Sequence, residues 1–211
     1  MSRAVVVLAA ALLALAAPAA ASCPVPDGAT HVARGSKAVA YVVRHGDSGW
    51  LYGCLRSVGE RVKVEAVYTD IDANHVHTVR VAGRFVAYVD VFESHYFTEE
   101  TSIESFDIRE REPRWRSEVA ESDGDAGDVA VVKRLLLAKN GAFAYFARRR
   151  YEDGTEPPAP WVRQLRARDR PGDTDRLLDS GEGIDRESIA LSGRTLTWLN
   201  DGEGRSATLR R

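Results

Sequence analysis

The sequence predicts an all-β fold built from four related repeats, and three observations support this. One short pattern occurs four times: a small or turn residue, an apolar run, a small residue and an aromatic residue. The aromatic residues of the four copies, Tyr41, Tyr88, Tyr145 and Trp198, lie 47, 57 and 53 residues apart. After residue 21, short β-rich runs alternate with Gly, Asp, Asn and Pro, and no long window has helical periodicity.

The first 21 residues have the features of an export signal. Arg3 precedes an unbroken apolar run over Ala4–Ala17, and Pro18–Ala21 provides the small residues that a signal peptidase accepts. We therefore expect residues 1–21 to be a signal peptide and residues 22–211 to be one secreted or cell-envelope domain. An N-terminal membrane anchor and a lipoprotein attached at Cys23 are the alternatives. No second apolar run is long enough to predict another membrane span.

The net charge limits the class of partner, and the cysteines indicate a disulfide. The net charge of −2 argues against nucleic-acid binding, which needs a clustered positive surface. The chain has two cysteines, Cys23 and Cys54, and both follow the export signal. In an oxidising compartment we expect them to form a disulfide.

The segment Ser22–Ala29 contains two prolines, which exclude a central strand but allow an edge strand. The chain after it divides into repeats at about 30–70, 76–120, 133–180 and 187–211. Three repeats have four expected strands each, and the last has three. We therefore expect Ser22–Ala29 to complete the last sheet beside Ala207–Arg210. The expected strands are His31–Arg34, Ala38–Val43, Trp50–Leu55, Val62–Val67, Thr78–Val81, Phe85–Val91, Ile103–Arg109, Trp115–Val119, Arg134–Ala138, Ala142–Ala147, Val162–Arg168, Asp175–Leu178, Ser188–Leu191, Thr195–Leu199 and Ala207–Arg210.

Four-stranded repeats of this length are typical of a β-propeller. The chain resembles the secreted, TolB- or WD-like propeller repeats, whose blades carry a Gly-x-x-apolar-Ala-aromatic second strand, as in Gly83–Val89. The resemblance covers nearly all of the mature chain and implies an architecture without a specific activity. We expect a four-bladed or incomplete β-propeller of antiparallel sheets. A β-sandwich is the alternative, and its strands would alternate more cleanly between apolar and polar residues.

An up-and-down order of strands places alternate connections at opposite ends of each sheet. One end would collect most of the acidic loop residues, and the other would collect basic residues with few acids, including Lys37, Arg56, Arg84, Arg109 and Arg194. Such a charge dipole favours oriented association with charged partners. Loops that only keep the protein soluble are the alternative.

Two connections at the acidic end are predicted to be long loops that bind a partner. They are Asp90–Thr101 and Arg148–Pro160, and Pro157-Pro158 makes the second rigid. Aromatic residues that fold back over a sheet edge are the alternative. The candidate binding residues are His95, Tyr96, Phe97, Arg149, Tyr151 and Trp161.

Two groups of residues are candidate metal ligands. The oxygen-rich stretch 121–128 could hold calcium through Asp123, Asp125 and Asp128, but it lacks the EF-hand spacing and the remote bidentate Glu, so a mobile acidic connection is the favoured interpretation. In an extended chain, His75 and His77 would point to one side, and with Asp70 and Asp72 they could form a zinc-type site. A histidine pair on an edge strand is the alternative for the second group.

No catalytic motif stands out. The chain has no Gly-x-Ser-x-Gly elbow and no glycine-rich phosphate loop. We therefore expect an exported, non-enzymatic binding or scaffold protein whose partner is an extracellular or cell-envelope protein or a glycan. We expect no cofactor, and calcium is the alternative. The alternative is a metal-assisted hydrolase or lyase with a pocket near His75 and His77. An incomplete propeller that acts as a subunit is a third hypothesis.

Overall fold

The computed structural model describes residues 22–68, 73–93, 98–123, 126–153, 160–169 and 174–210. In these ranges the chain forms fifteen β-strands and no helix, so the all-β prediction is confirmed. The paired strands of the described ranges are antiparallel, and every expected strand overlaps an observed one. The strands are β1 Thr30–Arg34, β2 Ala38–His45, β3 Ser48–Leu55, β4 Arg61–Tyr68, β5 Ala73–Ala82, β6 Phe85–Glu93, β7 Thr98–Asp107, β8 Glu112–Asp123, β9 Ala126–Leu137, β10 Phe143–Asp153, β11 Val162–Arg168, β12 Arg176–Ser180, β13 Ile184–Ser192, β14 Thr195–Asn200 and β15 Glu203–Thr208.

Hydrogen bonding follows chain order throughout. Strands β1–β4 form one sheet, β5–β12 form an eight-stranded sheet, and β13–β15 form a three-stranded sheet. Within the eight-stranded sheet, β8 and β9 pair only at Ser122 with Gly127 and at Asp123 with Ala126. We therefore treat this sheet as two four-stranded halves and name the units sheet A (β1–β4), sheet B (β5–β8), sheet C (β9–β12) and sheet D (β13–β15).

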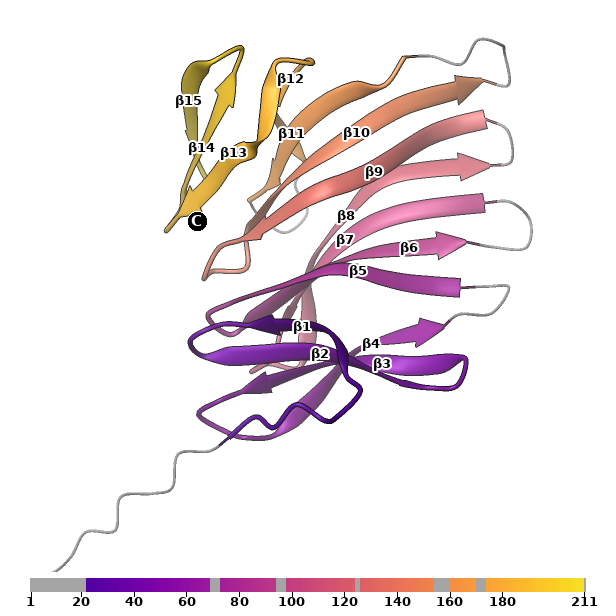
Figure 1. Cartoon of the computed structure of the whole chain (residues 1–211), viewed down its shortest axis with the longest axis vertical. Coiled ribbons are helices and arrows are strands. Elements are labelled where there is room, and N and C mark those ends of the chain that lie inside the picture. The colour runs from indigo at the N-terminus through magenta and orange to yellow at the C-terminus, as the bar shows by residue number, and fades with distance from the viewer. Residues whose placement is uncertain are drawn as a thin grey trace, which may run out of the picture.

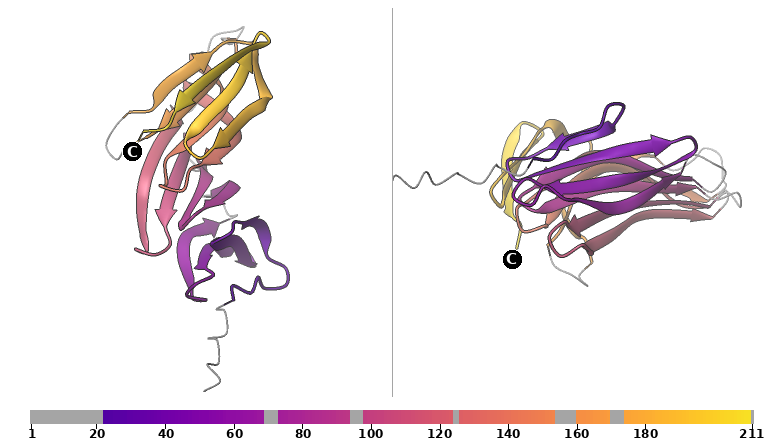
Figure 2. Two further views of the ribbon diagram at one scale, coloured as in Figure 1. Left: turned by 90° about the vertical axis from the view of Figure 1, so that its left-hand side faces the viewer. Right: turned by 90° about the horizontal axis from the view of Figure 1, so that it is seen from below.

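The sheets follow one another along the long axis of the molecule. Sheet A lies at one end and sheet D at the other, with sheets B and C between them (Figure 1). Figure 2 shows the same succession after a turn of 90° about the vertical axis. One apolar cluster joins sheet A to sheet B, and a second joins sheets B, C and D. Each sheet is therefore stabilised mainly by packing on its neighbours.

The second strand of each sheet shows where that packing occurs. In β2, β6 and β10, five consecutive residues are buried, at 38–42, 85–89 and 143–147, because both faces of these strands are covered. In β14 the buried residues alternate with exposed ones, so one face packs on sheet C and the other meets solvent. Sheet D therefore has the burial pattern of a terminal unit with a polar outer face.

The aromatic residue of each second strand contacts the preceding sheet. Between sheets A and B, the Tyr88 hydroxyl of β6 lies 3.0 Å from Oε2 of Glu65, on β4. The Tyr88 side chain is only 1 % exposed. This contact joins the second strand of one sheet to the fourth strand of the sheet before it.

The next two junctions have a similar arrangement. Tyr145 of β10 and Ser117 of β8 both donate hydrogen bonds to Asp175, so a carboxylate bridges sheets B and C. Trp198 of β14 donates from Nε1 to Oδ2 of Asp179, on β12, over 2.6 Å. At all three junctions, a polar contact therefore links the aromatic residue of the second strand to the fourth strand of the preceding sheet. The contact is either direct or passes through one carboxylate.

Strand register shows that the fourth-strand residues in these contacts are equivalent. Each lies directly opposite a third-strand aliphatic residue whose side chain is fully buried. The pairs are Leu51 with Glu65, Ile103 with Ser117, and Leu165 with Asp179.

Tyr41 of β2 has no sheet before it, and the N-terminal segment takes that place. Cys23 and Cys54 form a disulfide with a Cα–Cα distance of 5.8 Å, which confirms the predicted bond. Both cysteines cluster with Tyr41, and Val25 and Ala29 pack against them. The prediction that Ser22–Ala29 would complete the last sheet was wrong. The disulfide holds this segment on sheet A, and among the described strands β15 pairs only with β14.

Both connections predicted to be long loops contain more strand than expected: Asp90–Thr101 is strand at 90–93 and 98–101, and Arg148–Pro160 is strand at 148–153. Strand β6 extends to Glu93 and β7 begins at Thr98, while β10 extends to Asp153. The stretch 121–128 was predicted to be a mobile acidic connection, yet most of it belongs to the paired ends of β8 and β9. Charged residues have low β-propensity, but hairpin pairing extends the strands through them.

Candidate functional site

The antiparallel order places the turns β1–β2, β3–β4, β5–β6 and β7–β8 at one end of sheets A and B. Figure 1 shows the β1–β2, β5–β6 and β9–β10 turns on the same side of the molecule. This is the end predicted to be basic. The prediction that few acids lie there was wrong in part, because Arg84 pairs with Asp107 and Arg111 pairs with Glu60.

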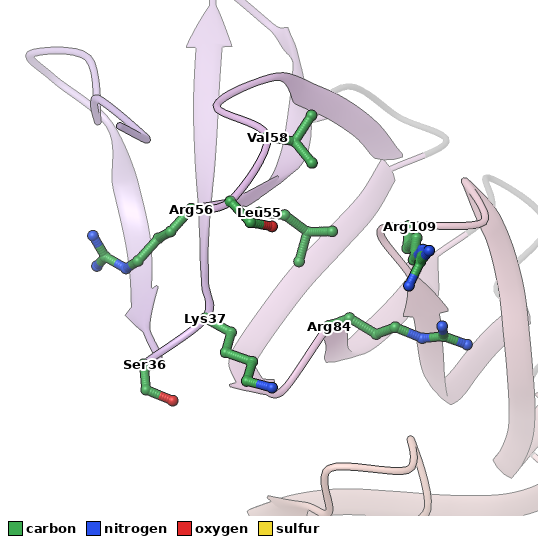
Figure 3. Close-up of a pocket in the computed structure, with 8 residues that line it drawn as sticks. Ser36, Lys37, Leu55, Arg56, Val58, Arg84 and Arg109 are labelled. Atoms are coloured by element: carbon green, nitrogen blue, oxygen red, sulfur yellow. The ribbon is translucent and has the colours of Figure 1, made fainter. Parts of the chain in front are cut away.

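A cleft of about 700 Å³ lies at this basic end. All four turns of sheets A and B contribute to it, so residues far apart in the sequence meet there (Figure 3). Four of its lining side chains are cationic, and none of the described lining residues is acidic. The lining consists of Ser36, Lys37, Leu55, Arg56, Ser57, Val58, Arg84 and Arg109.

Backbone hydrogen bonds fix the turns around the cleft. The N–H of Arg56 donates to the carbonyl of Lys37 over 2.9 Å, and the N–H of Ile108 donates to the carbonyl of Arg84 over 3.0 Å. Each bond ties the second turn of a sheet to its first turn. The positions from which Lys37 and Arg84 project are therefore set by the sheets.

Arg84 is anchored by a buried acid. Its Nη2 lies 2.7 Å from Oδ2 of Asp107, whose side chain is 1 % exposed. The other oxygen of Asp107 accepts the backbone N–H groups of Arg109 and Glu110. Lys37 and Arg109 have no ion-pair partner in the described part of the chain, and both extend to the side on which Arg84 lies, whereas Arg56 points the other way (Figure 3).

A second polar group lies inside the junction between sheets A and B. The Tyr88 hydroxyl lies 3.0 Å from Glu65 and 2.8 Å from Oε2 of Glu104. A phenol has one hydrogen and can donate it to only one carboxylate. The second contact is favourable only when that carboxyl group itself carries a proton.

Asp90 adds a third carboxyl group to this junction. Its Oδ1 is buried and has no hydrogen-bond partner among the described residues. Burial, together with the neighbouring Glu65 and Glu104, raises the pKa of Asp90 from 3.8 to about 7. Burial also raises the pKa of Glu104, although the Tyr88 hydroxyl and Arg116 act against it.

The last junction has the opposite electrostatics. Burial disfavours charge on Asp179, but hydrogen bonds from Trp198 and Asn200 and the nearby Arg205 lower its pKa below the ordinary value. This carboxylate therefore stays ionised at neutral pH.

The predicted binding residues are only partly within the described chain. His95, Tyr96 and Phe97 lie outside it. Arg149 forms an ion pair with Asp128 over 2.7 Å. Tyr151 is in β10, opposite Asp128. Trp161 is half-buried beneath the guanidinium groups of Arg148 and Arg150, which lie 5.2 and 4.7 Å from its ring centre.

The predicted metal ligands do not come together among the described residues, which contain no group of three or more such side chains. His75 and His77 lie on the edge strand β5 with ring centres 6.2 Å apart. Asp123 lies on β8, and Asp128 is the partner of Arg149. Asp70, Asp72 and Asp125 lie outside the described residues.

Sequence reasoning placed the cleft cations at one end of the molecule but did not bring them together. The signal was present in the turns, since Lys37 and Arg84 precede equivalent strands. The cluster of three carboxyl groups at the junction of sheets A and B was not predicted. Glu65, Asp90 and Glu104 lie on three different strands, and these come together only because sheet A packs on sheet B.

Neither a protein-family model, nor a curated protein, nor a solved structure matches this chain. The resemblance to secreted propeller repeats therefore depends on the repeated motif and on the order of the four sheets along the molecule. Within the described residues, no helix is long and apolar enough to cross a membrane.

Proposed function

We propose that the chain is an exported, non-enzymatic binding or scaffold protein with an open, propeller-like succession of four sheets. The observation that supports this most strongly is the polar contact repeated at each junction, from the aromatic residue of one second strand to the preceding sheet, either directly or, for Tyr145, through Asp175. Such contacts fix each sheet against the next and leave the connections at the two ends available to a partner. The partner class is an extracellular or cell-envelope protein or a glycan.

The partner surface in this proposal is the end that carries the β6–β7 and β10–β11 connections. Strands β6, β7 and β10 lead to it, and Trp161 with Arg148 and Arg150 lies beside it. Aromatic residues and arginine are enriched at protein–protein interfaces, and the two guanidinium groups here lie over the ring.

Export and binding can be tested together in the producing cell. The mature protein should begin at Ser22 when its N-terminus is sequenced from the envelope or medium. Chemical cross-linking there should give adducts that disappear when Trp161→Ala is introduced, while the melting temperature stays unchanged. Adducts that persist in this variant, or a chain that keeps residues 1–21 in the cytoplasm, would contradict the proposal.

The metal-assisted hydrolase remains the alternative, with His75 and His77 at its centre. It predicts that a divalent metal raises the melting temperature, that EDTA lowers it, and that His75→Ala abolishes both shifts. Calcium binding through Asp123, Asp125 and Asp128 predicts a shift that calcium alone produces. A melting temperature that no metal and no chelator changes would exclude both.

A further inference from the structure

We propose that the cleft at the basic end binds a phosphate monoester attached to an apolar group. The cleft is formed by the turns of sheets A and B, at the end opposite the partner surface proposed above. The two sites are separate, so a failure of one proposal leaves the other standing.

The charge of the cleft identifies the ligand as an anion with two charges. Lys37, Arg84 and Arg109 lie on one side of it, and the Arg84 charge is balanced by Asp107, over 2.7 Å, with Glu110 at 3.5 Å. Two further cations line the cleft without an ion-pair partner among the described residues: Arg109 lies near the guanidinium of Arg84, and Lys37 extends toward the backbone of Arg84 (Figure 3). A phosphate monoester at neutral pH carries between 1.5 and 2 negative charges, as phosphoserine does. A carboxylate or a sulfate monoester carries only one.

Two apolar side chains also line the cleft, together with two serines. Leu55 is 8 % exposed and Val58 is 60 % exposed, and both line the cleft between the cationic turns. A volume of about 700 Å³ is within the range of small-molecule sites. The part of the ligand that follows the phosphate is therefore expected to be apolar and to pack on these two side chains.

The cleft is also preorganised for binding. The bonds from Arg56 to Lys37 and from Ile108 to Arg84 hold the turns in place, and Asp107 orients Arg84. An anion therefore finds the cations already gathered, and less conformational entropy is lost when it binds.

Phenyl phosphate is the probe for this site, because it combines the dianion with an apolar ring. Isothermal titration calorimetry of the full mature protein should show one site. The Lys37→Gln and Arg109→Gln substitutions should each weaken the affinity roughly tenfold, since each removes a charged partner. Phenyl sulfate, with one charge, and inorganic phosphate, without the ring, should both bind more weakly than phenyl phosphate.

The matched control is Arg194→Gln. Arg194 lies in the β13–β14 turn at the same end, and its backbone carbonyl accepts the N–H of Leu209 as that of Arg84 accepts the N–H of Ile108. The substitution also removes one positive charge, but at a position outside the cleft. The affinity for phenyl phosphate should therefore stay unchanged. Arg84→Gln is not used, because it would leave the buried Asp107 without its partner and could unfold the chain.

Two results would overturn the proposal. One is the absence of binding of both phenyl phosphate and phosphatidic acid vesicles, and the other is an equal loss of affinity in Arg194→Gln, which would indicate a diffuse electrostatic effect. Binding to phosphatidic acid vesicles that depends on Lys37 and Arg109, without binding of phenyl phosphate, would support the site and place the ester on a lipid rather than on a soluble molecule.

Discussion

At the scale of single residues, Asp90 makes the stability of the protein depend on pH. Its pKa is about 7 in the folded chain, against 3.8 ordinarily, so the folded state binds this proton more tightly than the unfolded state does. The free energy of unfolding should therefore fall as the pH rises from about 4 to about 7, and this contribution should then level off. Urea titrations across this range measure the change.

Asp90→Asn keeps the neutral form and removes the titration. The variant should match the wild type below about pH 4, become progressively more stable than the wild type as the pH rises, and keep this advantage above about pH 7. Asp179→Asn is the control, because that carboxylate is held ionised by Trp198 and Asn200 and its loss should destabilise the chain at neutral pH. Parallel curves for Asp90→Asn and the wild type would contradict this role for Asp90.

Gly53 allows the close approach of sheets A and B. A Cβ atom at this position would lie 2.8 Å from Cγ1 of the buried Ile108. Gly53→Ala should therefore destabilise the fold by roughly 1–3 kcal/mol. Gly204→Ala is the matched control, because nothing lies within 4 Å of its Cβ position, and it should have little effect on the denaturation midpoint. Equal midpoints for the two variants would show that the sheets do not approach closely at Gly53.

At the scale of elements, the N-terminal segment acts as a cover for sheet A. It packs on Tyr41 and is held by the Cys23–Cys54 bond, which closes a loop with a sequence separation of 31. Replacing both cysteines with serine should cost about 3–4 kcal/mol of unfolding free energy. It should also make residues 22–29 the first site of limited proteolysis. Unchanged stability and an uncut N-terminus would show that the segment does not cover the sheet.

The elements also show what could be predicted from sequence. The second strands were identified because Ala38–Val42 and its counterparts are almost continuously apolar, as expected of strands covered on both faces. The start of β7 and the end of β8 were not, because Glu99, Glu100 and Glu121 suggest a loop and only hairpin pairing makes them strand. The place of Ser22–Ala29 was mispredicted although the sequence contained the signal. Its two prolines allow an edge position on any sheet, but the expected disulfide from Cys23 to Cys54 ties the segment to the strand that contains Cys54, in sheet A.

The candidate sites were predicted less well for a similar reason. The cations of the cleft were assigned to the correct end, since strand polarity alone decides that. Their convergence, and the Tyr88 cluster, depend on how closely one sheet packs on the next, which no local pattern in the sequence encodes.

At the scale of the whole molecule, both outer faces of the succession of sheets are closed. The N-terminal segment covers sheet A, and the outer face of β14 presents Thr195 and Thr197 to solvent, with Leu199 38 % exposed. A continuous apolar surface for self-association is therefore not exposed on these faces. We expect light scattering after size exclusion to give the mass of one chain, and a stable dimer would contradict this.

The account depends on one kind of contact, in which an aromatic residue of a second strand holds the preceding sheet. A double-mutant cycle on Trp198→Phe and Asp179→Asn, followed by urea unfolding at neutral pH, tests it most directly. The account predicts a coupling free energy of about 1–3 kcal/mol, because the bond joins a buried indole to a carboxylate across two sheets. A coupling indistinguishable from zero would mean that this contact does not hold the sheets together.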